Sequence, residues 1–241
     1  MSPVTDASDL NGDGFRCVNC GRRIEKLFVE YSPGNIRLMK CDNCKAVADP
    51  YIECEFMIIF IDLILHKPKA FRHLLYNVLN LEKIDIKGIS LKSGLMNFIL
   101  DAYRVSLLIR SKGSRDSSRS SLEFTWTCLK VFLNVLIGNL IFVTVLWIGI
   151  RVLLRLNYHI CRYREILLAV LVSSYFKMFF LAMMVWDFPF ASIFIVDVFV
   201  LTSNTVALRV LTQLRTSACT VLCLCAHSAK FLASHWLLNL L

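Results

Sequence analysis

Four cysteines near the N-terminus have the spacing of a metal site. Cys17 and Cys20 form one C-x2-C pair, Cys41 and Cys44 form another, and twenty residues separate the pairs. Each pair can turn so that both thiolates face one ion, and a hairpin between the pairs would complete a tetrahedron. The pattern predicts a structural zinc ion, which supplies folding free energy that so small a core lacks. Disulfides or free thiols are the alternative.

Two charged residues interrupt long apolar stretches in the C-terminal half. Lys177 and Asp197 each lie ten residues from Asp187, which marks a turn between the stretches. At helical rise both would sit about 15 Å from that turn, near the middle of a bilayer. A lone charge there costs about 2.5–3.5 kcal/mol, so we expect Lys177 and Asp197 to pair. The pair would be either a structural clasp or a polar spot on a path for lipid headgroups.

Sequence signatures of catalysis are missing from the chain. There is no GxSxG, HExxH, phosphate-binding loop or dinucleotide fingerprint. We therefore expect a protein that is not an enzyme.

The charge distribution favours membranes over nucleic acid as a partner. Residues 1–55 hold 7 Lys/Arg against 9 Asp/Glu, so the cysteine module is slightly acidic and would repel phosphates. Residues 56–127 hold 11 Lys/Arg against 6 Asp/Glu, and residues 128–241 hold 9 Lys/Arg against 3 Asp/Glu. This positive excess lies beside apolar segments, where it suits anionic headgroups and membrane orientation.

Composition and patterning indicate a membrane protein. Apolar residues make up 56% of the 241 residues and charged residues only 19%. Between the cysteine pairs, strand-like runs at 27–31 and 36–40 flank a turn at 32–35. The predicted fold class is an α-helical multi-span membrane protein with a small N-terminal four-cysteine, zinc-ribbon-like β module.

The chain divides into five predicted regions. They are a disordered tail at 1–14, a zinc-ribbon domain at 15–66, an amphipathic helical region at 67–110, a Ser/Arg-rich linker at 111–127 and transmembrane helices at 128–241. The helices are expected at about 131–150, 166–186 and 188–208, with a weaker fourth at 218–241. The apolar run 56–65 reaches about 15 Å, too short to span alone, so it is a buried or re-entrant helix or part of an irregular span. The helices of 67–110 either lie in the membrane interface or pack within a cytosolic domain.

The sidedness of the membrane segments follows from arginines. The short loop Arg151–Glu165 holds four of them and should face the cytosol. Reduced zinc ligands favour a cytosolic ribbon, which requires an even number of crossings before that loop. The basic linker before the first strong span leaves two options: the run 56–65 spans irregularly, or one basic flank is lumenal.

A series of short motifs resembles the homology domain of the ARV family (ACAT-related protein required for viability), in particular a plant member. In chain order the motifs are FRCVNCG (15–21), VEYS (29–32), NIRL (35–38), CDNC (41–44), ADPYIE (48–53), IDL (61–63) and AFRHLL (70–75). The close resemblance covers about residues 15–77, and beyond it only the plan of several C-terminal spans agrees. Six further positions match the family without an assigned role: Asp49, Tyr51, Glu53, Asp62, Arg72 and His73.

The resemblance implies a function in lipid homeostasis. Members of the family are multi-pass endoplasmic-reticulum membrane proteins needed for sterol homeostasis, intracellular sterol trafficking and distribution, with effects on sphingolipid metabolism. The expected partners are membrane lipids including sterols. The alternative is a scaffold or glycolipid-transfer component that supports glycosylphosphatidylinositol anchor biosynthesis, with lipid- or anchor-synthesis enzymes as partners. Lipid transport predicts intramembrane polar residues lining a path, whereas a scaffold predicts an exposed apolar-centred patch on the ribbon.

Overall fold

A computed structural model describes residues 15–79, 86–112, 121–154, 163–185 and 191–240. The predicted tail 1–14, the Asp187 turn, residues 113–120 of the predicted linker and residues 155–162 of the Arg-rich loop lie outside these residues. The chain forms two compact units, Met1–Ile86 and Lys87–Leu241, here called the ribbon unit and the helical unit. Each is described by itself.

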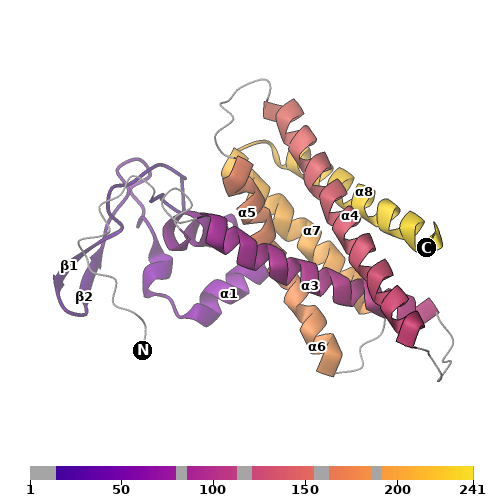
Figure 1. The fold of residues 1–241 in the computed structure, drawn as a ribbon. Helices are drawn as coiled ribbons and strands as arrows, with labels where there is room; N and C mark the ends of the chain where they lie inside the picture. The colour runs from indigo at the N-terminus through magenta and orange to yellow at the C-terminus, as the bar shows by residue number, and fades with distance from the viewer. Residues whose placement is uncertain (1–14, 80–85, 113–120, 155–162, 186–190, 241) are drawn as a thin grey trace. The chain divides into compact units, whose positions relative to one another are not determined.

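The ribbon unit contains a two-stranded antiparallel sheet (Figure 1). β1 (Phe28–Ser32) pairs with β2 (Asn35–Leu38) in the register Phe28 to Leu38, with an irregularity between Glu30 and Ser32. Gly34 closes the hairpin with a φ of +83°, a left-handed conformation that glycine adopts without strain. The hairpin lies where the strand-like runs predicted it. A small core of Phe15, Leu27 and Ala48 packs beneath it.

Four short helices complete the described part of the ribbon unit. They are η1 (Pro50–Glu53), α1 (Phe56–Ile64), α2 (Pro68–Arg72) and the π-helical η2 (His73–Val78). α1 has nine residues, and several of its apolar side chains are exposed, Phe56 by 74% and Met57 by 59%. The predicted region 67–110 is therefore divided, because α2 and η2 belong to the ribbon unit and the next helix belongs to the helical unit.

The helical unit is built from α3 (Ile86–Lys112), α4 (Ser121–Leu154), α5 (Tyr163–Ser173), η4 (Ser174–Met178), α6 (Phe179–Val185), α7 (Ala191–Thr212) and α8 (Thr216–Leu240). Within the described residues, four segments are long and apolar enough to cross a membrane. They are Thr125–Leu153, Arg164–Ala182, Ala191–Thr212 and Thr216–Asn239. These segments overlap the four apolar stretches of the sequence and mark a membrane protein.

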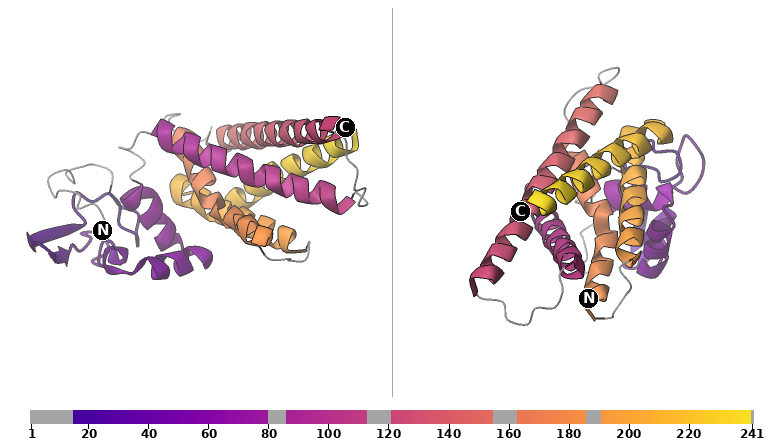
Figure 2. Two further views of the ribbon diagram at one scale, coloured as in Figure 1. Left: turned by 60° about the horizontal axis from the view of Figure 1, so that its bottom comes forward. Right: turned by 90° about the vertical axis from the view of Figure 1, so that its right-hand side faces the viewer.

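The bundle core forms where α4, α5, α7 and α8 meet (Figure 2). Leu146 and Ile150 of α4 pack there with Leu222 of α8, and the small thiols of Cys219 and Cys223 fill the remaining space. Gly149 allows this approach, because a Cβ at that position would lie 2.0 Å from Cδ1 of Leu222. Shape complementarity of this kind holds the helices in one arrangement.

A 3-10 turn interrupts the second candidate span. η4 separates α5 from α6 and carries Lys177. Side chains of neighbouring helices satisfy the carbonyls beside the break: Asn97 donates to Leu171 O at 3.0 Å and Ser203 donates to Ser173 O at 2.7 Å. Irregular backbone at membrane depth is tolerated where neighbouring protein groups supply such bonds.

α3 presents polar residues to the bundle and apolar residues outward. Asn97 and Asp101 are at least nine-tenths buried, whereas Leu91, Leu95 and Ile99 on the opposite face are more than half exposed. Water-soluble amphipathic helices have the reverse arrangement. The sequence pattern showed that this helix is amphipathic, but not which face packs inward.

Candidate metal centre and intramembrane polar site

The four predicted metal ligands converge on one point of the ribbon unit. The sulfur atoms of Cys17, Cys20, Cys41 and Cys44 all lie within 4.8 Å of one another. Two sulfur pairs, Cys17 with Cys44 and Cys20 with Cys41, are 3.7 and 3.6 Å apart. These separations exceed a disulfide bond, and the nine described cysteines are free.

The two C-x2-C pairs repeat one backbone geometry. In each pair the first cysteine's carbonyl accepts from the amide four residues on, and its amide donates to the carbonyl five residues on. These bonds measure 2.8–2.9 Å: Gly21 N to Cys17 O, Cys17 N to Arg22 O, Lys45 N to Cys41 O and Cys41 N to Ala46 O. The residue after each second cysteine is left-handed, with φ of +78° at Gly21 and +58° at Lys45. Each turn therefore directs two thiols to the same side.

This donor set fits a tetrahedral zinc ion. Zinc–sulfur bonds of about 2.3 Å require sulfur atoms about 3.8 Å apart in a tetrahedron, close to the observed separations. With four protein sulfurs, no position is left for a substrate or a reactive water, so a bound ion would be structural. Cys17 and Cys41 are buried, whereas Cys20 is exposed, so an ion could enter from one side.

Ionisation of the thiols favours a cation at this site. Burial raises the pKa of Cys17 to about 12. Burial also opposes ionisation of Cys20, but hydrogen bonds from the Arg22 amide and the Asn43 side chain lower its pKa to about 6. The Ala46 amide likewise lowers the pKa of Cys44. Without a metal the Cys17 thiol therefore keeps its proton at neutral pH, and a divalent cation would replace that proton.

A buried carboxylate joins the cysteine pairs to the following helices. The Asp49 side chain is fully buried and accepts from Tyr51 N at 3.0 Å, from His73 Nδ1 at 2.6 Å and from Asn77 Nδ2 at 2.5 Å. The Asn77 side chain also exchanges two bonds with the backbone of Arg16, of 2.9 and 3.0 Å. Because Arg16 precedes the first of the four cysteines, this network fixes η2 against the candidate metal centre.

Two further contacts explain most of the unassigned family positions. Arg72 donates to the carbonyls of Val18 and Asn19, between the first two cysteines, at 2.8 Å each. Asp62 accepts from Tyr51 Oη at 2.8 Å and from Lys67 Nζ at 2.7 Å. Hydrogen bonds from Lys67 and Tyr51 lower the pKa of Asp62.

Side-chain contacts of five of the six positions thus hold the ribbon unit together. These positions are Asp49, Tyr51, Asp62, Arg72 and His73. The sixth, Glu53, is exposed.

The predicted ion pair between Lys177 and Asp197 is wrong, because each residue has another partner. Lys177 Nζ lies 2.9 Å from Asp101 Oδ1, and Asp197 pairs with Arg104. Both partners are supplied by α3. The matched depth of the two charges was a sound reason to expect neutralisation, but it did not identify which helix provides it.

Asp101 is shared between two lysines. Its other oxygen, Oδ2, lies 2.7 Å from Lys230 Nζ of α8, and Lys230 also donates to Asn139 Oδ1 of α4 at 2.8 Å. The Asp101 side chain is only 4% exposed. One carboxylate therefore connects α3, η4 and α8 inside the bundle.

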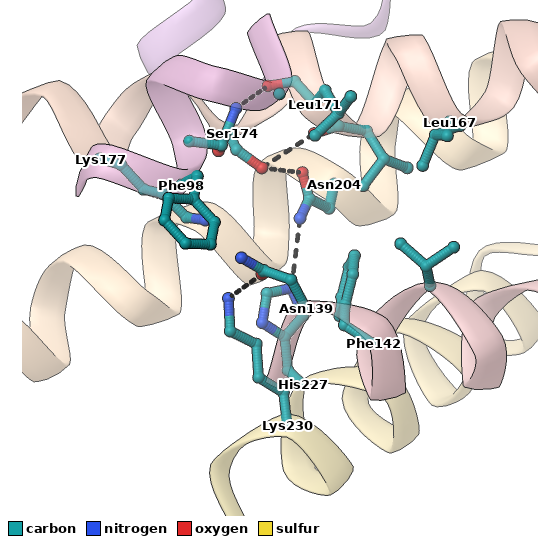
Figure 3. Close-up of a pocket in the computed structure, with 14 residues that line it drawn as sticks. Phe98, Asn139, Phe142, Leu167, Leu171, Ser174, Lys177, Asn204, His227 and Lys230 are labelled. Atoms are coloured by element: carbon teal, nitrogen blue, oxygen red, sulfur yellow. Dashed lines mark hydrogen bonds between the residues drawn. The ribbon is translucent and has the colours of Figure 1, made fainter. Parts of the chain in front are cut away.

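A cavity of about 220 Å³ adjoins this cluster. Figure 3 shows Lys230, Asn139, His227 and Asn204 around it, with the rings of Phe98 and Phe142 beside them. Leucine and valine side chains of α4 and α5 line much of the rest. The cavity is thus apolar with a polar, positively charged part, a combination that suits an amphipathic ligand.

Hydrogen bonds assign the protonation of His227. Asn204 Oδ1 accepts from Ser173 Oγ at 2.6 Å and from Ser174 Oγ at 3.2 Å, so its Nδ2 faces His227 Nε2 at 3.2 Å. Since Nδ2 can only donate, Nε2 is an acceptor and the imidazole is neutral with its proton on Nδ1. Nδ1–H remains a donor in the cavity wall.

Sequence reasoning missed Asp101, Arg104 and Lys230 as members of this site. Asn97, Asp101 and Arg104 recur at helical spacing, and this stripe was the available signal.

Comparison with known proteins gives one family. The Arv1-like family matches residues 16–208. Protein ARV 2 of Arabidopsis thaliana is 51% identical over 216 residues, covering 90% of this chain and 92% of that protein. Protein ARV 1 of Arabidopsis thaliana is 50% identical over 217 residues, covering 90% of this chain and 86% of that protein. Protein ARV1 of Homo sapiens is 27% identical over 205 residues, covering 81% of this chain and 72% of that protein. No solved structure matches the chain.

The first testable prediction concerns the metal. The purified full-length protein should contain one zinc per chain, measured by elemental analysis. Cys→Ser at any of the four ligands should abolish retention of zinc and expose the ribbon unit to protease, because the small apolar core is insufficient to keep the metal-free unit folded. Acidification should release the ion, because protons compete for the thiolates. Cys54→Ser, in the same unit but outside the cluster, is the control. A metal-free ribbon unit that still resists protease would contradict the prediction.

The second prediction concerns Asp49. Asp49→Asn places an amide where an acceptor for His73 and Asn77 is needed, so one buried donor loses its partner. We expect the free energy of unfolding of the ribbon unit to fall by about 3 kcal/mol, measured by urea-induced zinc release. Glu53→Gln removes an exposed carboxylate from the same segment and should change little. Equal stability of the two variants would show that the network does not support the metal centre.

Proposed function

Because the chain belongs to the Arv1-like family as a plant member, we propose that it is an endoplasmic-reticulum membrane protein that mediates sterol homeostasis. In this role it carries out intracellular sterol trafficking and distribution, with effects on sphingolipid metabolism. Membrane lipids including sterols are its partners. Zinc is its structural cofactor, and it acts without catalysis and without nucleic acid.

The polar cavity among the candidate spans is the observation that supports this proposal. A lipid leaving a bilayer leaflet carries a polar end through an apolar environment, and desolvation of that end is the main cost. The cavity offers side-chain donors and acceptors from Asn139, Asn204 and His227 within an apolar wall. Intramembrane polar residues of this kind are what a lipid path requires.

The same cavity also limits what part of a lipid fits. About 220 Å³ exceeds the 150 Å³ or so of an engineered protein cavity that binds benzene, but it is smaller than a typical pocket for a whole ligand. It accommodates the polar end of a lipid and leaves the apolar body between or outside the helices.

A scaffold that supports glycosylphosphatidylinositol anchor biosynthesis is the second candidate function, and one observation favours it. α1 presents exposed Phe56, Met57 and Ile61 in the ribbon unit. Such a patch suits docking of a lipid- or anchor-synthesis enzyme. It lies on a helix rather than on the β-hairpin.

The third prediction tests lipid movement directly. Full-length protein reconstituted in liposomes should speed sterol transfer to acceptor vesicles above the rate of protein-free liposomes. Asn204→Leu removes the acceptor of two serines and the donor to His227, and should slow transfer about fivefold or more. Thr202→Val, an exposed position of α7, is the matched control.

Cells without the protein should misplace sterols while still making them. Transfer no faster than in protein-free liposomes would contradict the proposal. So would a lipid-forming reaction that is lost in those cells and restored by the pure protein alone.

A further inference from the structure

The charges at the cavity do not balance. Lys177 and Lys230 line it, and the described carboxylate that contacts both is Asp101. Arg104 and Asp197 pair with each other nearby and contribute no net charge. His227 is neutral by its hydrogen bonds. Two ammonium groups against one carboxylate leave one positive charge in excess within the bundle.

An excess charge inside a membrane protein is stabilised by a counterion. A second carboxylate in place of one of the neighbouring asparagines would have neutralised the cluster, yet Asn97, Asn139 and Asn204 occupy the lining. These residues donate and accept hydrogen bonds without adding charge. Because a charge at bilayer depth is costly, the arrangement is stable when a negatively charged group enters.

The remaining polar atoms describe that group further. Lys177 and Lys230 reach the cavity from η4 and α8, so an anion between them would meet two ammonium groups. Asn97 is 9% exposed, and its Oδ1 has no hydrogen-bond partner among the described residues, so it can accept from a hydroxyl. Tetrahedral oxyanions accept from several donors at once, as lysines and a histidine N–H can provide.

We propose that this cavity binds the phosphate of a lipid headgroup, held by Lys177 and Lys230 with Asp101 as the group that keeps both lysines in place. The proposal rests on the lipid-handling function above and names its substrate class: an anionic phospholipid or phosphorylated sphingolipid rather than a neutral sterol alone. A phosphate ion from the aqueous phase has the same chemistry, so the test must separate the two sources.

Photo-crosslinking in vesicles tests this assignment. Full-length protein is reconstituted in phosphatidylcholine vesicles that contain a trace of photoactivatable phosphatidic acid, diacylglycerol or sterol, and labelled peptides are identified by mass spectrometry. Phosphatidic acid should label α3, α4 and α8 around the cavity more strongly than diacylglycerol. Lys177→Met and Lys230→Met should each reduce this labelling about tenfold or more.

The variants are chosen so that folding does not decide the result. Either single lysine substitution leaves Asp101 paired with the other lysine, so the cluster becomes neutral and no carboxylate is stranded. Lys130→Met, which removes a cation from α4 outside the cavity lining, should label as wild type. Dispersity on size exclusion confirms that each variant is folded.

Each remaining outcome overturns the proposal. Equal labelling by phosphatidic acid and diacylglycerol, or full labelling of both folded lysine variants, would show that charge is not recognised. Displacement of the lipid by millimolar inorganic phosphate would assign the site to the free ion. Sterol labelling of the cavity without phosphatidic acid labelling would refute this proposal and leave the proposed function intact. Labelling by none of the lipids would count against both.

A second inference comes from the outward face of α3. Leu91, Leu95, Met96 and Ile99 form an exposed apolar ridge, while Asp101 and Arg104 on the other face pair with residues of candidate spans. The ring of Phe98 contacts Phe132 of α4, so the ridge continues the apolar surface of a candidate span. At 27 residues α3 is about 40 Å long, enough to cross a bilayer when tilted.

We infer that α3 crosses the membrane, with acyl chains of lipid against its apolar ridge. Its low overall hydropathy reflects a polar face that the bundle buries rather than a place in water. α3 and α4 then supply an even number of crossings before the Arg-rich loop, as a cytosolic ribbon requires. The short apolar run of α1 need not span.

Protease accessibility in sealed microsomes tests this inference. A cleavage site is inserted before α3, at residues 80–85, or after it, at residues 113–120, in the full-length chain. If α3 crosses, one site is cut in sealed vesicles and the other is cut only after detergent is added. Cutting of both sites before detergent, or of both only after it, would place the two ends of α3 on one side and refute the crossing.

Discussion

The helical unit depends on a single buried carboxylate. Asp101 lies between two ammonium groups, one from the interrupted second span and one from the last helix. Removed from water, each of these charges alone would oppose folding in a bilayer, whereas together they join three helices. The 3-10 turn of η4 places Lys177 in this cluster, and Asn97 satisfies a carbonyl that the break exposes. Backbone irregularity and charge pairing are therefore parts of one arrangement.

The ribbon unit follows a similar principle with different chemistry. Its apolar core is small, and four convergent cysteines that could hold a metal ion, together with a buried Asp49 network, replace the burial that a larger domain would have. Asp49 accepts three hydrogen bonds, and Asn77 carries the connection to the backbone beside Cys17. Family-motif residues outside the cysteine pairs thus have a physical role: they fix the loops that present the cysteines. This explains why the family motifs extend well beyond the metal ligands.

The two units contribute different parts of the proposed lipid-handling function. The helical unit contains the groups that can receive a polar lipid end, namely the amides, the imidazole and the ammonium groups around an apolar cavity. The ribbon unit offers a rigid fold and an exposed apolar helix, features that suit attachment to a membrane or a protein partner. A lipid-handling protein needs both a site for the headgroup and a means to stay near its source or its acceptor.

The sequence by itself determined the features whose cause is local. The C-x2-C spacing predicted the convergence of four sulfurs, and two strand-like runs around a turn predicted the hairpin. The length of the apolar stretches predicted three spans and a weaker fourth. It also located Lys177 and Asp197 as charges that need neutralising. Tertiary structure alone decided their partners, because helical spacing does not show which neighbouring helix approaches either charge. Contacts between residues far apart in sequence determine three further features. These are the orientation of the polar face of α3 toward the bundle, the helix break at η4, and the pairing of Asp101 with two lysines. Such contacts are selected by the packing of the whole bundle, which no single segment specifies.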